Sequence, residues 1–258
     1  MCPLKMRALK SVVQQWMRQL ELRPWARLAM ASVASLAVAF TLSSCVNVAT
    51  YDQPSLVRAI DASYIAPAVN VVVESIPVAS NMGQGSIGIY ATVPANNAAL
   101  IKITEATGGV ALVTTNGTVQ AGHHHTIFLT DNGAAPTGYE VTILEDQQVA
   151  AASGHSAFRF LNQAPKIGPV DIYMVPGSST LANTIPLVSG LAVGSTAGYV
   201  SFPAQTVTMV IVPKGLLTPK YTSASLALVG GEVRTILIVD TQLTSDPPVN
   251  VYMATDVQ

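Results

Sequence analysis

The chain is poor in charged side chains, and this scarcity excludes several classes of protein. Its 258 residues include 13 Lys plus Arg and 14 Asp plus Glu, or 10% charged residues, where a soluble domain typically carries about 25%. A formal net charge of -1 provides no basic field for the release of counterions from a nucleic acid, and no run of Lys or Arg creates one locally. We therefore expect neither a disordered charged tail nor a nucleic-acid partner.

Cysteine and aromatic residues are also scarce. The two cysteines are Cys2 and Cys45, so a domain that follows Cys45 has no second Cys with which to form an intramolecular disulfide. Aromatic residues make up 6% of the chain, which leaves few rings that could stack on sugars. This composition favours another protein, or a second copy of the chain, over a glycan as the binding partner.

The first 44 residues have the organisation of a secretory leader. They hold six of the 13 basic residues, and the apolar stretch at residues 28–42 that follows Arg27 is 15 residues long, too short to span a bilayer comfortably. A basic region, a short apolar run and a small-residue exit are typical of a helical signal peptide, here expected at residues 1–44. The stretch before Arg18 is long for such a leader, so Met1 and Met17 are both candidates for the start.

The end of the leader, Leu42-Ser43-Ser44-Cys45, resembles the lipobox of bacterial lipoproteins, in which the Cys is lipidated and the chain is cleaved before it. The resemblance implies a covalent lipid on Cys45. At about 0.8 kcal/mol per buried CH₂ group, two or three acyl chains would hold the protein on a membrane. Val46 is not the Asp that marks inner-membrane retention, so the resemblance favours the outer membrane of a Gram-negative bacterium. An ordinary signal peptide that contains a Cys is the alternative.

The chain after the leader repeats itself. Val57-Arg58-Ala59-Ile60 corresponds to Phe158-Arg159-Phe160-Leu161 at an offset of 101, and residues 122–131 correspond to residues 231–240 at an offset of 109. An eight-residue insertion around residues 176–183 accounts for the change of offset. We predict a lipidated linker at residues 45–54 and two tandem domains at residues 55–150 and 151–258.

Each copy has the pattern of short β-strands separated by turns. Runs rich in Val, Ile, Thr and Tyr alternate with turn residues, and tight turns are expected at Gly108-Gly109, Asn116-Gly117 and Asp131-Asn132-Gly133. No stretch after residue 50 has a capped apolar stripe of helical period. We predict an all-β protein with two tandem immunoglobulin-like antiparallel β-sandwiches. Strands of the first copy are expected at residues 69–73, 87–93, 100–104, 110–114, 126–130 and 139–144.

The segment that begins at Arg58 and its counterpart in the second copy carry recognisable motifs. They are Asp61-Ala62-Ser63, Ala66-Pro67-Ala68-Val69-Asn70-Val71 and, in the second copy, Gly198-Tyr199 followed by Pro203-Ala204. These residues resemble the motifs of the DUF4397 family, a bacterial extracytoplasmic β-domain of unknown function that usually occurs in tandem, and the resemblance implies an extracytoplasmic β-fold. The family's His in the first motif is replaced by Asp61 in the first copy and Asn162 in the second, and its Pro-Asp pair by Tyr64-Ile65 in the first copy.

Three consecutive histidines lead into a predicted strand. On a strand, His123 and His125 point to the same face with side chains roughly 7 Å apart at their bases, a spacing that suits Zn²⁺ or Cu²⁺. Two imidazoles need a further ligand, and the second copy has no histidine at the equivalent positions. We therefore expect a solvated polar strand entrance, with a metal site as the alternative.

Two pairs of polar residues recur at matching positions of the repeat. Arg58 and Arg159 must either pair within each domain or mark a shared surface, and we predict pairing with a carboxylate or backbone carbonyls inside each repeat. Asn70 and Asp171 lie between apolar neighbours, where a short polar side chain suits a bend or a local hydrogen bond to the backbone.

The familiar motifs of enzymes are missing or misplaced. Residues 83–88 fit G-x-G-x-x-G, but a strand pattern follows them instead of a helix, so we predict a β-turn or bulge. There is no G-x-S-x-G elbow, Cys45 is not free once acylated, and the carboxylates are scattered. We therefore predict no catalysis and no cofactor apart from the lipid. The expected role is structural or protein-binding at the cell envelope, and a metal-binding envelope protein using His123 and His125 is the alternative.

Overall fold

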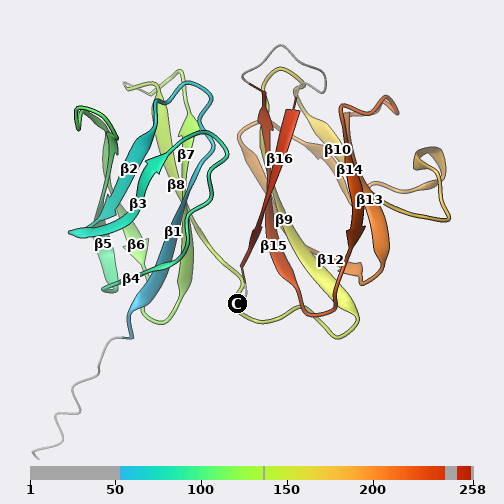
Figure 1. Ribbon diagram of the computed structural model, residues 1–258, viewed down its shortest axis with the longest axis horizontal. Helices are drawn as coiled ribbons and strands as arrows, with labels where there is room; N and C mark the ends of the chain where they lie inside the picture. Colours follow the sequence, from blue (N-terminus) through green and yellow to red (C-terminus); the bar gives the residue numbers. More distant parts are fainter. Residues whose placement is uncertain (1–52, 136, 242–248, 257–258) are drawn as a thin grey trace, which may run out of the picture. The chain divides into compact units, whose positions relative to one another are not determined.

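The computed structural model describes residues 53–135, 137–241 and 249–256, which form two β-sandwiches (Figure 1). The predicted leader at residues 1–44, Cys45 and both candidate start residues lie outside the described residues. Helical structure in the described part is limited to the short 3-10 turn η2 (Leu181–Asn183), and no helix there is long and apolar enough to cross a membrane.

The first sandwich contains two four-stranded sheets. Its inner sheet packs against the second sandwich and has the order β4-β1-β7-β8, and its outer sheet has the order β3-β2-β5-β6. The inner strands are β1 (Ser55–Asp61), β4 (Ala91–Val93), β7 (His124–Asp131) and β8 (Tyr139–Glu145). The outer strands are β2 (Val69–Val73), β3 (Ile76–Met82), β5 (Asn96–Glu105) and β6 (Ala111–Val119).

The second sandwich repeats this arrangement. Its inner sheet has the order β12-β9-β15-β16 and its outer sheet the order β11-β10-β13-β14. The inner strands are β9 (His155–Gln163), β12 (Ser195–Pro203), β15 (Val233–Asp240) and β16 (Val249–Thr255). The outer strands are β10 (Val170–Pro176), β11 (Val188–Leu191), β13 (Thr206–Pro213) and β14 (Tyr221–Ala227).

The predicted all-β class with two sandwiches is confirmed, with one difference in strand pairing. Most neighbours are antiparallel, but β1 pairs with β7 and β9 pairs with β15 in parallel. Turn residues reveal how strands adjacent in sequence connect. They carry no information on the pairing of β1 with β7, because these two strands are far apart in the sequence.

The turn chemistry predicted part of the connections correctly. Gly108 and Gly109 have φ of +86° and +67° between β5 and β6, and a turn follows Asp131 at the end of β7. The predicted turn at Asn116-Gly117 is wrong, because both residues lie inside β6. A Cβ atom on Gly117 would lie 2.0 Å from Cδ1 of Ile143, so Gly is needed here to let a β8 side chain pack closely.

Two other strand boundaries differ from the prediction. The expected strand at residues 87–93 is reduced to the bridge between Ile87 and Ile60 and the short β4. An edge strand not expected at all, β3, lies next to β2 in the outer sheet. Its alternation is interrupted by polar residues and Pro77, which suit an edge strand and weaken the period-two signal.

The central inner strands, β1, β7, β9 and β15, are buried on both faces, which explains their continuous apolar runs. One face of β7, β9 and β15 contributes to the core of its own sandwich, and the other face packs against the opposite sandwich. Both sandwiches consequently belong to one compact unit. The side chains of this inter-sandwich core are Ile60, Ala62, Phe128, Leu161, Leu237 and Val239, with Ile87, Leu144 and Tyr252 packed against them.

The two outer sheets differ at the connection between their first two strands in sequence. In the first sandwich two residues, Glu74 and Ser75, join β2 to β3, whereas the longer β10–β11 connection carries η2. Leu181 of η2 packs against a small apolar cluster that includes Tyr173 and Val212. The inserted residues therefore cover the outer face of the second sandwich.

Gly85 provides a close contact between the sandwiches. Its φ is +76°, and a Cβ atom there would lie 2.2 Å from the ring of Tyr252 in β16. Gly194, at the corresponding place of the second sandwich, has φ of +75° and no atom within 4 Å of a Cβ. The two glycines share a backbone conformation and differ in what covers them.

We expect Gly85→Ala to destabilise the protein more than Gly194→Ala. Both variants incur a backbone cost of about 1–2 kcal/mol at positive φ. Gly85→Ala also displaces the Tyr252 ring, which adds about 1–3 kcal/mol of overpacking. Urea unfolding of both variants measures the difference. Equal losses would show that Tyr252 does not pack on Gly85.

Candidate functional site

Two buried arginines lie between the two inner sheets. Arg58 in β1 and Arg159 in β9 are 2% and 3% exposed. The parallel pairing places Thr126 of β7 beside Arg58 and Thr235 of β15 beside Arg159. Each threonine Oγ1 accepts a hydrogen bond from the arginine Nε, at 2.9 Å in the first sandwich and 3.1 Å in the second. The same strand register therefore orients both guanidinium groups.

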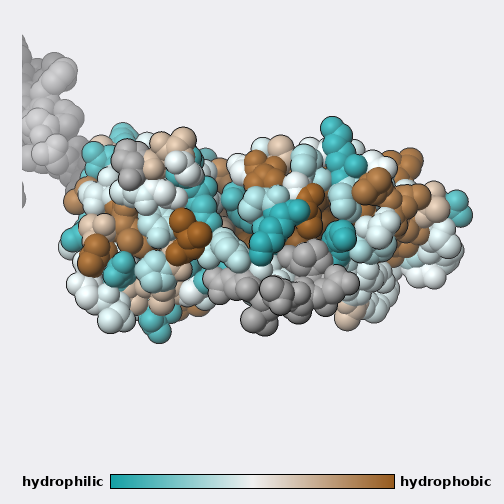
Figure 2. All heavy atoms as spheres, turned by 90° about the horizontal axis from the view of Figure 1, so that it is seen from above, coloured by the Kyte–Doolittle hydropathy of each residue, from teal (hydrophilic) through white to brown (hydrophobic). Residues whose placement is uncertain are grey.

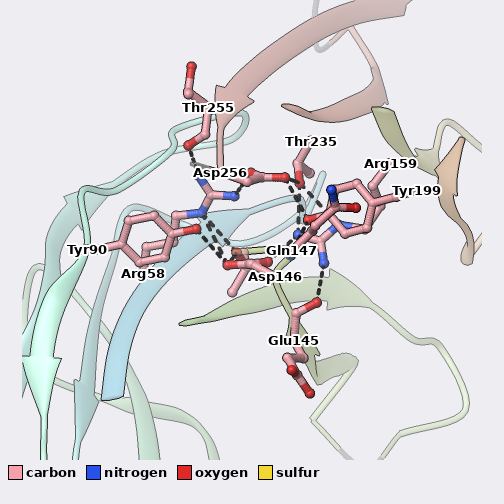
Figure 3. A network of polar contacts seen from close by, with 11 residues as sticks. Arg58, Tyr90, Glu145, Asp146, Gln147, Arg159, Tyr199, Thr235, Thr255 and Asp256 are labelled. Carbon is pink, nitrogen blue, oxygen red and sulfur yellow. Dashed lines mark hydrogen bonds and ion pairs between the residues drawn. The ribbon is translucent and has the colours of Figure 1, made fainter. Parts of the chain in front are cut away.

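Each guanidinium pairs with a carboxylate of the other sandwich (Figure 3). Arg58 Nη2 forms a buried ion pair with Asp256, the residue after β16, and Arg159 Nη2 forms one with Asp146, the residue after β8. The Nη1 groups donate to backbone carbonyls next to these aspartates, Thr255 at 2.9 Å and Glu145 at 3.0 Å. Each sandwich thus supplies the arginine of one ion pair and the aspartate of the other.

Two tyrosines complete this reciprocal Arg–Asp network. The Tyr90 hydroxyl donates to Asp146 Oδ2 and the Tyr199 hydroxyl to Asp256 Oδ2, both at 2.7 Å. Their rings also lie beneath the guanidinium groups, with Arg58 Cζ 4.7 Å from the Tyr90 centroid and Arg159 Cζ 5.0 Å from the Tyr199 centroid.

The network keeps both tyrosines protonated. Burial raises the pKa of Tyr90 and of Tyr199 above the usual range. The carboxylates of Asp146 and Asp256 raise the pKa of Tyr90 further and Asp256 raises that of Tyr199, while Arg58 and Arg159 act in the opposite direction. Each hydroxyl therefore remains a hydrogen-bond donor.

Every carboxylate oxygen of the network accepts a hydrogen bond from the protein. Asp146 Oδ1 binds Arg159, and Asp146 Oδ2 accepts from both Thr126 Oγ1 at 2.6 Å and Tyr90. Asp256 is satisfied in the same way by the second sandwich and Arg58. Such an arrangement fixes the relation between two protein surfaces, because every buried donor and acceptor has a partner in the protein.

The prediction that each arginine pairs within its own repeat is wrong. The ion-pair partner and the carbonyl acceptor of each guanidinium come from the opposite sandwich. The carboxylate that Arg58 meets in its own sandwich, Asp146, is more distant, with 4.0 Å between Arg58 Nε and Asp146 Oδ2. The alternative, that the repeated arginines mark a shared surface, describes the structure.

The sequence reasoning missed the aspartates, tyrosines and threonines of the network, although the repeat contained a signal for them. Tyr90 and Tyr199, like the two threonines, are 109 residues apart, and Asp146 and Asp256 are 110 apart. A search of the repeat for identical polar residues would have found all three pairs. The offsets alone do not show that the three pairs lie together in the folded protein.

The two histidines of the metal hypothesis, His123 and His125, have different surroundings. His123 Nδ1 lies 2.7 Å from Glu145 Oε1, and its side chain is 42% exposed. His125 is buried, and its Nε2 accepts a hydrogen bond from the Gln120 N–H at 3.0 Å. Burial lowers the pKa of His125, which is consistent with a neutral acceptor ring. The prediction of a solvated strand entrance is therefore wrong for His125.

The metal hypothesis for His123 and His125 stays a prediction. Their rings are stacked on one face with centroids 6.4 Å apart. In the described part of the chain, no group of three or more His, Cys, Asp or Glu side chains is arranged to hold a metal ion. The lone pair of His125 Nε2 is already used by a backbone N–H.

Asn70 and Asp171 accept hydrogen bonds from the neighbouring edge strand. Asn70 Oδ1 accepts from the Asn81 N–H at 2.9 Å, and Asp171 Oδ1 accepts from the Gly190 N–H at 2.6 Å. Asn81 and Gly190 both have positive φ. Burial acts to raise the pKa of Asp171, but hydrogen bonds from the N–H groups of Gly215 and Gly190 outweigh it, and the pKa is lowered. Both side chains therefore fix local backbone geometry.

The segment that fits G-x-G-x-x-G is a turn. The Ser86 N–H donates to the Gly83 carbonyl at 2.9 Å, and Gly85 has positive φ. The N–H groups of Gly85 and Gly88 donate to carbonyls of β1 at 2.7 Å and 2.8 Å and are not available to a phosphate. The predicted turn is confirmed.

Two residues of the network lie in the segments that carry the family resemblance. Arg58 opens the first family segment, and Tyr199 lies in the second. A comparison with family models matches a domain of unknown function, DUF4397, at residues 55–173. The chain contains a DUF4397 domain. The match covers the whole first sandwich and continues through β9 into β10.

Other comparisons add little to the DUF4397 match. A comparison with curated proteins finds no match. Among solved structures, the chain is similar to CBMbc, a family CBM26 module from Eubacterium rectale Amy13K crystallised with maltoheptaose. The two share 8% sequence identity with a TM-score of 0.23, over 78% of this chain and 96% of that one.

We expect removal of one charge of the network to be strongly destabilising. Arg159→Ala leaves the buried Asp146 without its ionic partner, which should cost about 3–5 kcal/mol of the free energy of unfolding. A double variant, Arg159→Met with Asp146→Asn, removes both charges and should recover most of this loss. Denaturant unfolding measures both.

Arg234→Ala is the matched control. Arg234 pairs with Glu232 in the same sandwich, and the two side chains are 22% and 25% exposed. An exposed pair contributes about 0–1 kcal/mol. A loss in Arg159→Ala no larger than that in Arg234→Ala would contradict a structural role for the network.

Proposed function

We propose that this chain is a lipid-anchored protein of the cell envelope, whose two sandwiches are tandem DUF4397 domains at residues 55–150 and 151–258 with a structural or protein-binding role. The observation that carries the proposal is the reciprocal Arg–Asp network. It places two buried arginines and two buried aspartates in an interface between the sandwiches, where each of them is paired with protein groups. Interaction with partners then depends on the outer surfaces and not on a reactive centre.

The lipobox-like sequence supports an anchor at the outer membrane of a Gram-negative bacterium. Cys45 precedes Ser55, the first residue of β1, by ten positions, so a short linker separates the proposed lipid from the first sandwich. The paired sandwiches would then be held close to the membrane. The covalent lipid on Cys45 is the one non-protein group in this proposal.

The outer surfaces suit contacts with another envelope protein or a second copy of the chain. From residue 45 onward the chain carries 7 basic and 13 acidic residues, which gives weak electrostatic protection against association. Apolar residues occupy separate patches on the face that Figure 2 shows. Ile89 and Ile185 are 82% and 87% exposed.

The edge strand β6 is the surface best suited to pairing with another strand. It lies at the free edge of the first outer sheet, is nine residues long and contains no Pro, Lys, Arg, Asp or Glu. Such an edge presents unpaired backbone groups to a partner. The opposite edge, β3, contains Pro77 and a positive φ at Asn81, which both disfavour pairing.

Metabolic labelling with a palmitate analogue tests the anchor. We expect label in the wild type and in Cys2→Ala, which removes the other cysteine of the chain, and none in Cys45→Ala. The labelled protein should fractionate with the outer membrane. Equal labelling of Cys45→Ala and the wild type would refute lipidation at this residue.

Cross-linking in intact cells, followed by mass spectrometry, tests the binding role. The wild type should form a discrete adduct, and the double variant Thr114→Lys/Asn116→Lys in β6 should form several-fold less, because it adds charge to the exposed edge. Thr222→Lys, on the edge strand β14, is the control and should leave the adduct unchanged. Recovery of the wild type only as an uncross-linked monomer would contradict the proposal.

A further inference from the structure

Asp61, the last residue of β1, is a buried carboxyl group with an incomplete set of partners. It is 1% exposed. Its Oδ1 accepts a hydrogen bond from the Ser63 N–H at 3.0 Å, while Oδ2 has no hydrogen-bond partner among the described residues. A buried carboxylate oxygen without a donor is costly, whereas a protonated oxygen can itself donate.

The second sandwich shows what this position requires. Asn162 stands where Asp61 stands, since Asp61 pairs with Leu129 of β7 and Asn162 pairs with Ile238 at the corresponding place of β15. The backbone contacts agree, because the carbonyls of Asp61 and Asn162 accept from the N–H groups of Gly85 and Gly194.

The side-chain contacts of Asn162 identify the missing interaction. Asn162 Oδ1 accepts from the Ala164 N–H at 3.1 Å, as Asp61 Oδ1 accepts from Ser63. Asn162 Nδ2 donates to the carbonyls of Gly168 and Leu191, both at 3.0 Å. Asp61 Oδ2 therefore corresponds to Asn162 Nδ2, an atom that donates hydrogen bonds to carbonyl oxygens.

The first sandwich has a counterpart of Leu191. Leu191 pairs with Val170, and Met82 pairs with Val69 at the corresponding place. Met82 and Asp61 line the same small internal pocket, whose other walls are apolar. A negative charge on Oδ2 would lie among apolar groups, while a proton there would allow Oδ2 to donate to a backbone carbonyl, as Nδ2 does in the second sandwich.

The charged groups around Asp61 oppose its ionisation. Asp131, at the end of β7, binds Ser63 Oγ and accepts from the Tyr64 N–H at 2.7 Å. The pKa of Asp61 is raised to about 7, and burial is the largest cause; the Ser63 N–H acts to lower it and the charge of Asp131 acts to raise it. Glu105 and Tyr139 also lie in this acidic environment, where burial and then the charges of Asp131, Glu105 and Asp61 raise the pKa of Tyr139.

The nearest groups of the second sandwich do not reverse this balance. The Lys166 ammonium group donates to the Tyr64 hydroxyl at 3.3 Å and to the Thr241 carbonyl at 3.2 Å, and it is directed to these oxygens instead of Asp61. Asp240, the counterpart of Asp131, accepts from the Lys166 backbone N–H at 2.9 Å.

We propose that Asp61 is protonated in the native protein up to neutral pH, that its Oδ2 donates a hydrogen bond to backbone as Asn162 Nδ2 does, and that loss of this proton loosens the contact between the sandwiches. Asp61 holds the turn at residues 83–86, because its N–H donates to the Ser86 carbonyl at 3.1 Å and its carbonyl accepts from Gly85. The ring of Tyr252 from the second sandwich covers Gly85. A charge on Asp61 would therefore affect the contact of Gly85 with Tyr252 through this turn.

The direction of the pH dependence follows from the protonation of the two states. An unfolded Asp loses its proton near its ordinary pKa of 3.8, whereas native Asp61 keeps it to about 7. Between these values the native state binds more protons, so the Asp61 contribution to stability falls as the pH rises from about 4 to 7 and is constant above that range.

Carbon-detected NMR titration of the full chain in detergent tests the protonation directly. The Asp61 Cγ resonance, assigned through its own backbone, should titrate with a midpoint near neutral pH, and Asp131→Asn should lower this midpoint. A midpoint near 4 would overturn the proposal, and this measurement needs no variant of Asp61 to fold.

Two reciprocal variants test the consequence for stability. Asp61→Asn copies the second sandwich and should raise the melting temperature at pH 8 by roughly 10 °C, with a gain that disappears towards pH 4. Asn162→Asp places the same carboxyl group in the second sandwich and should make the melting temperature fall more steeply between pH 4 and 7. An Asp61→Asn variant destabilised equally at every pH would overturn the proposal.

Discussion

The structure depends on two buried ion pairs in which each sandwich supplies the arginine of one pair and the aspartate of the other. Neither charge can be left alone in the interface, because an unpaired buried ion is far more costly than the same ion in water. The apolar side chains around Phe128 and Leu237 stabilise the interface by burial, but the hydrophobic effect does not favour one orientation of the sheets. The network selects one orientation of the two inner sheets, since only that orientation satisfies both guanidinium groups.

Much of the fold was predictable because it follows from local chemistry. Period-two patterns and turn residues gave the all-β class and the β2 strand, while the internal repeat indicated the symmetry between the sandwiches. The parallel pairing of β1 with β7 and the strand position of Gly117 were not predictable in this way. Both depend on neighbours distant in sequence, and for Gly117 the deciding neighbour is one methyl group of Ile143.

The candidate site was predictable only in part, for the same reason. The repeated Arg58 and Arg159 drew attention to the correct strands, but the partner of each arginine follows a strand of the other domain. The continuous apolar runs of β7 and β15 do carry a signal that these strands are covered on both faces. They do not identify what covers them, and His125 was expected to be solvated for lack of that information.

The reciprocal exchange has a consequence for how this architecture can evolve. An isologous pairing is closed: once Arg58 meets Asp256 and Arg159 meets Asp146, no equivalent face is free for a third copy. Gene duplication beyond two domains would add a module with an unmatched polar surface, and deletion of one would uncover a charged face. Substitutions within each pair are also coupled across the two halves of the gene, so we expect the copies to diverge elsewhere while the arginine and aspartate of one pair change together.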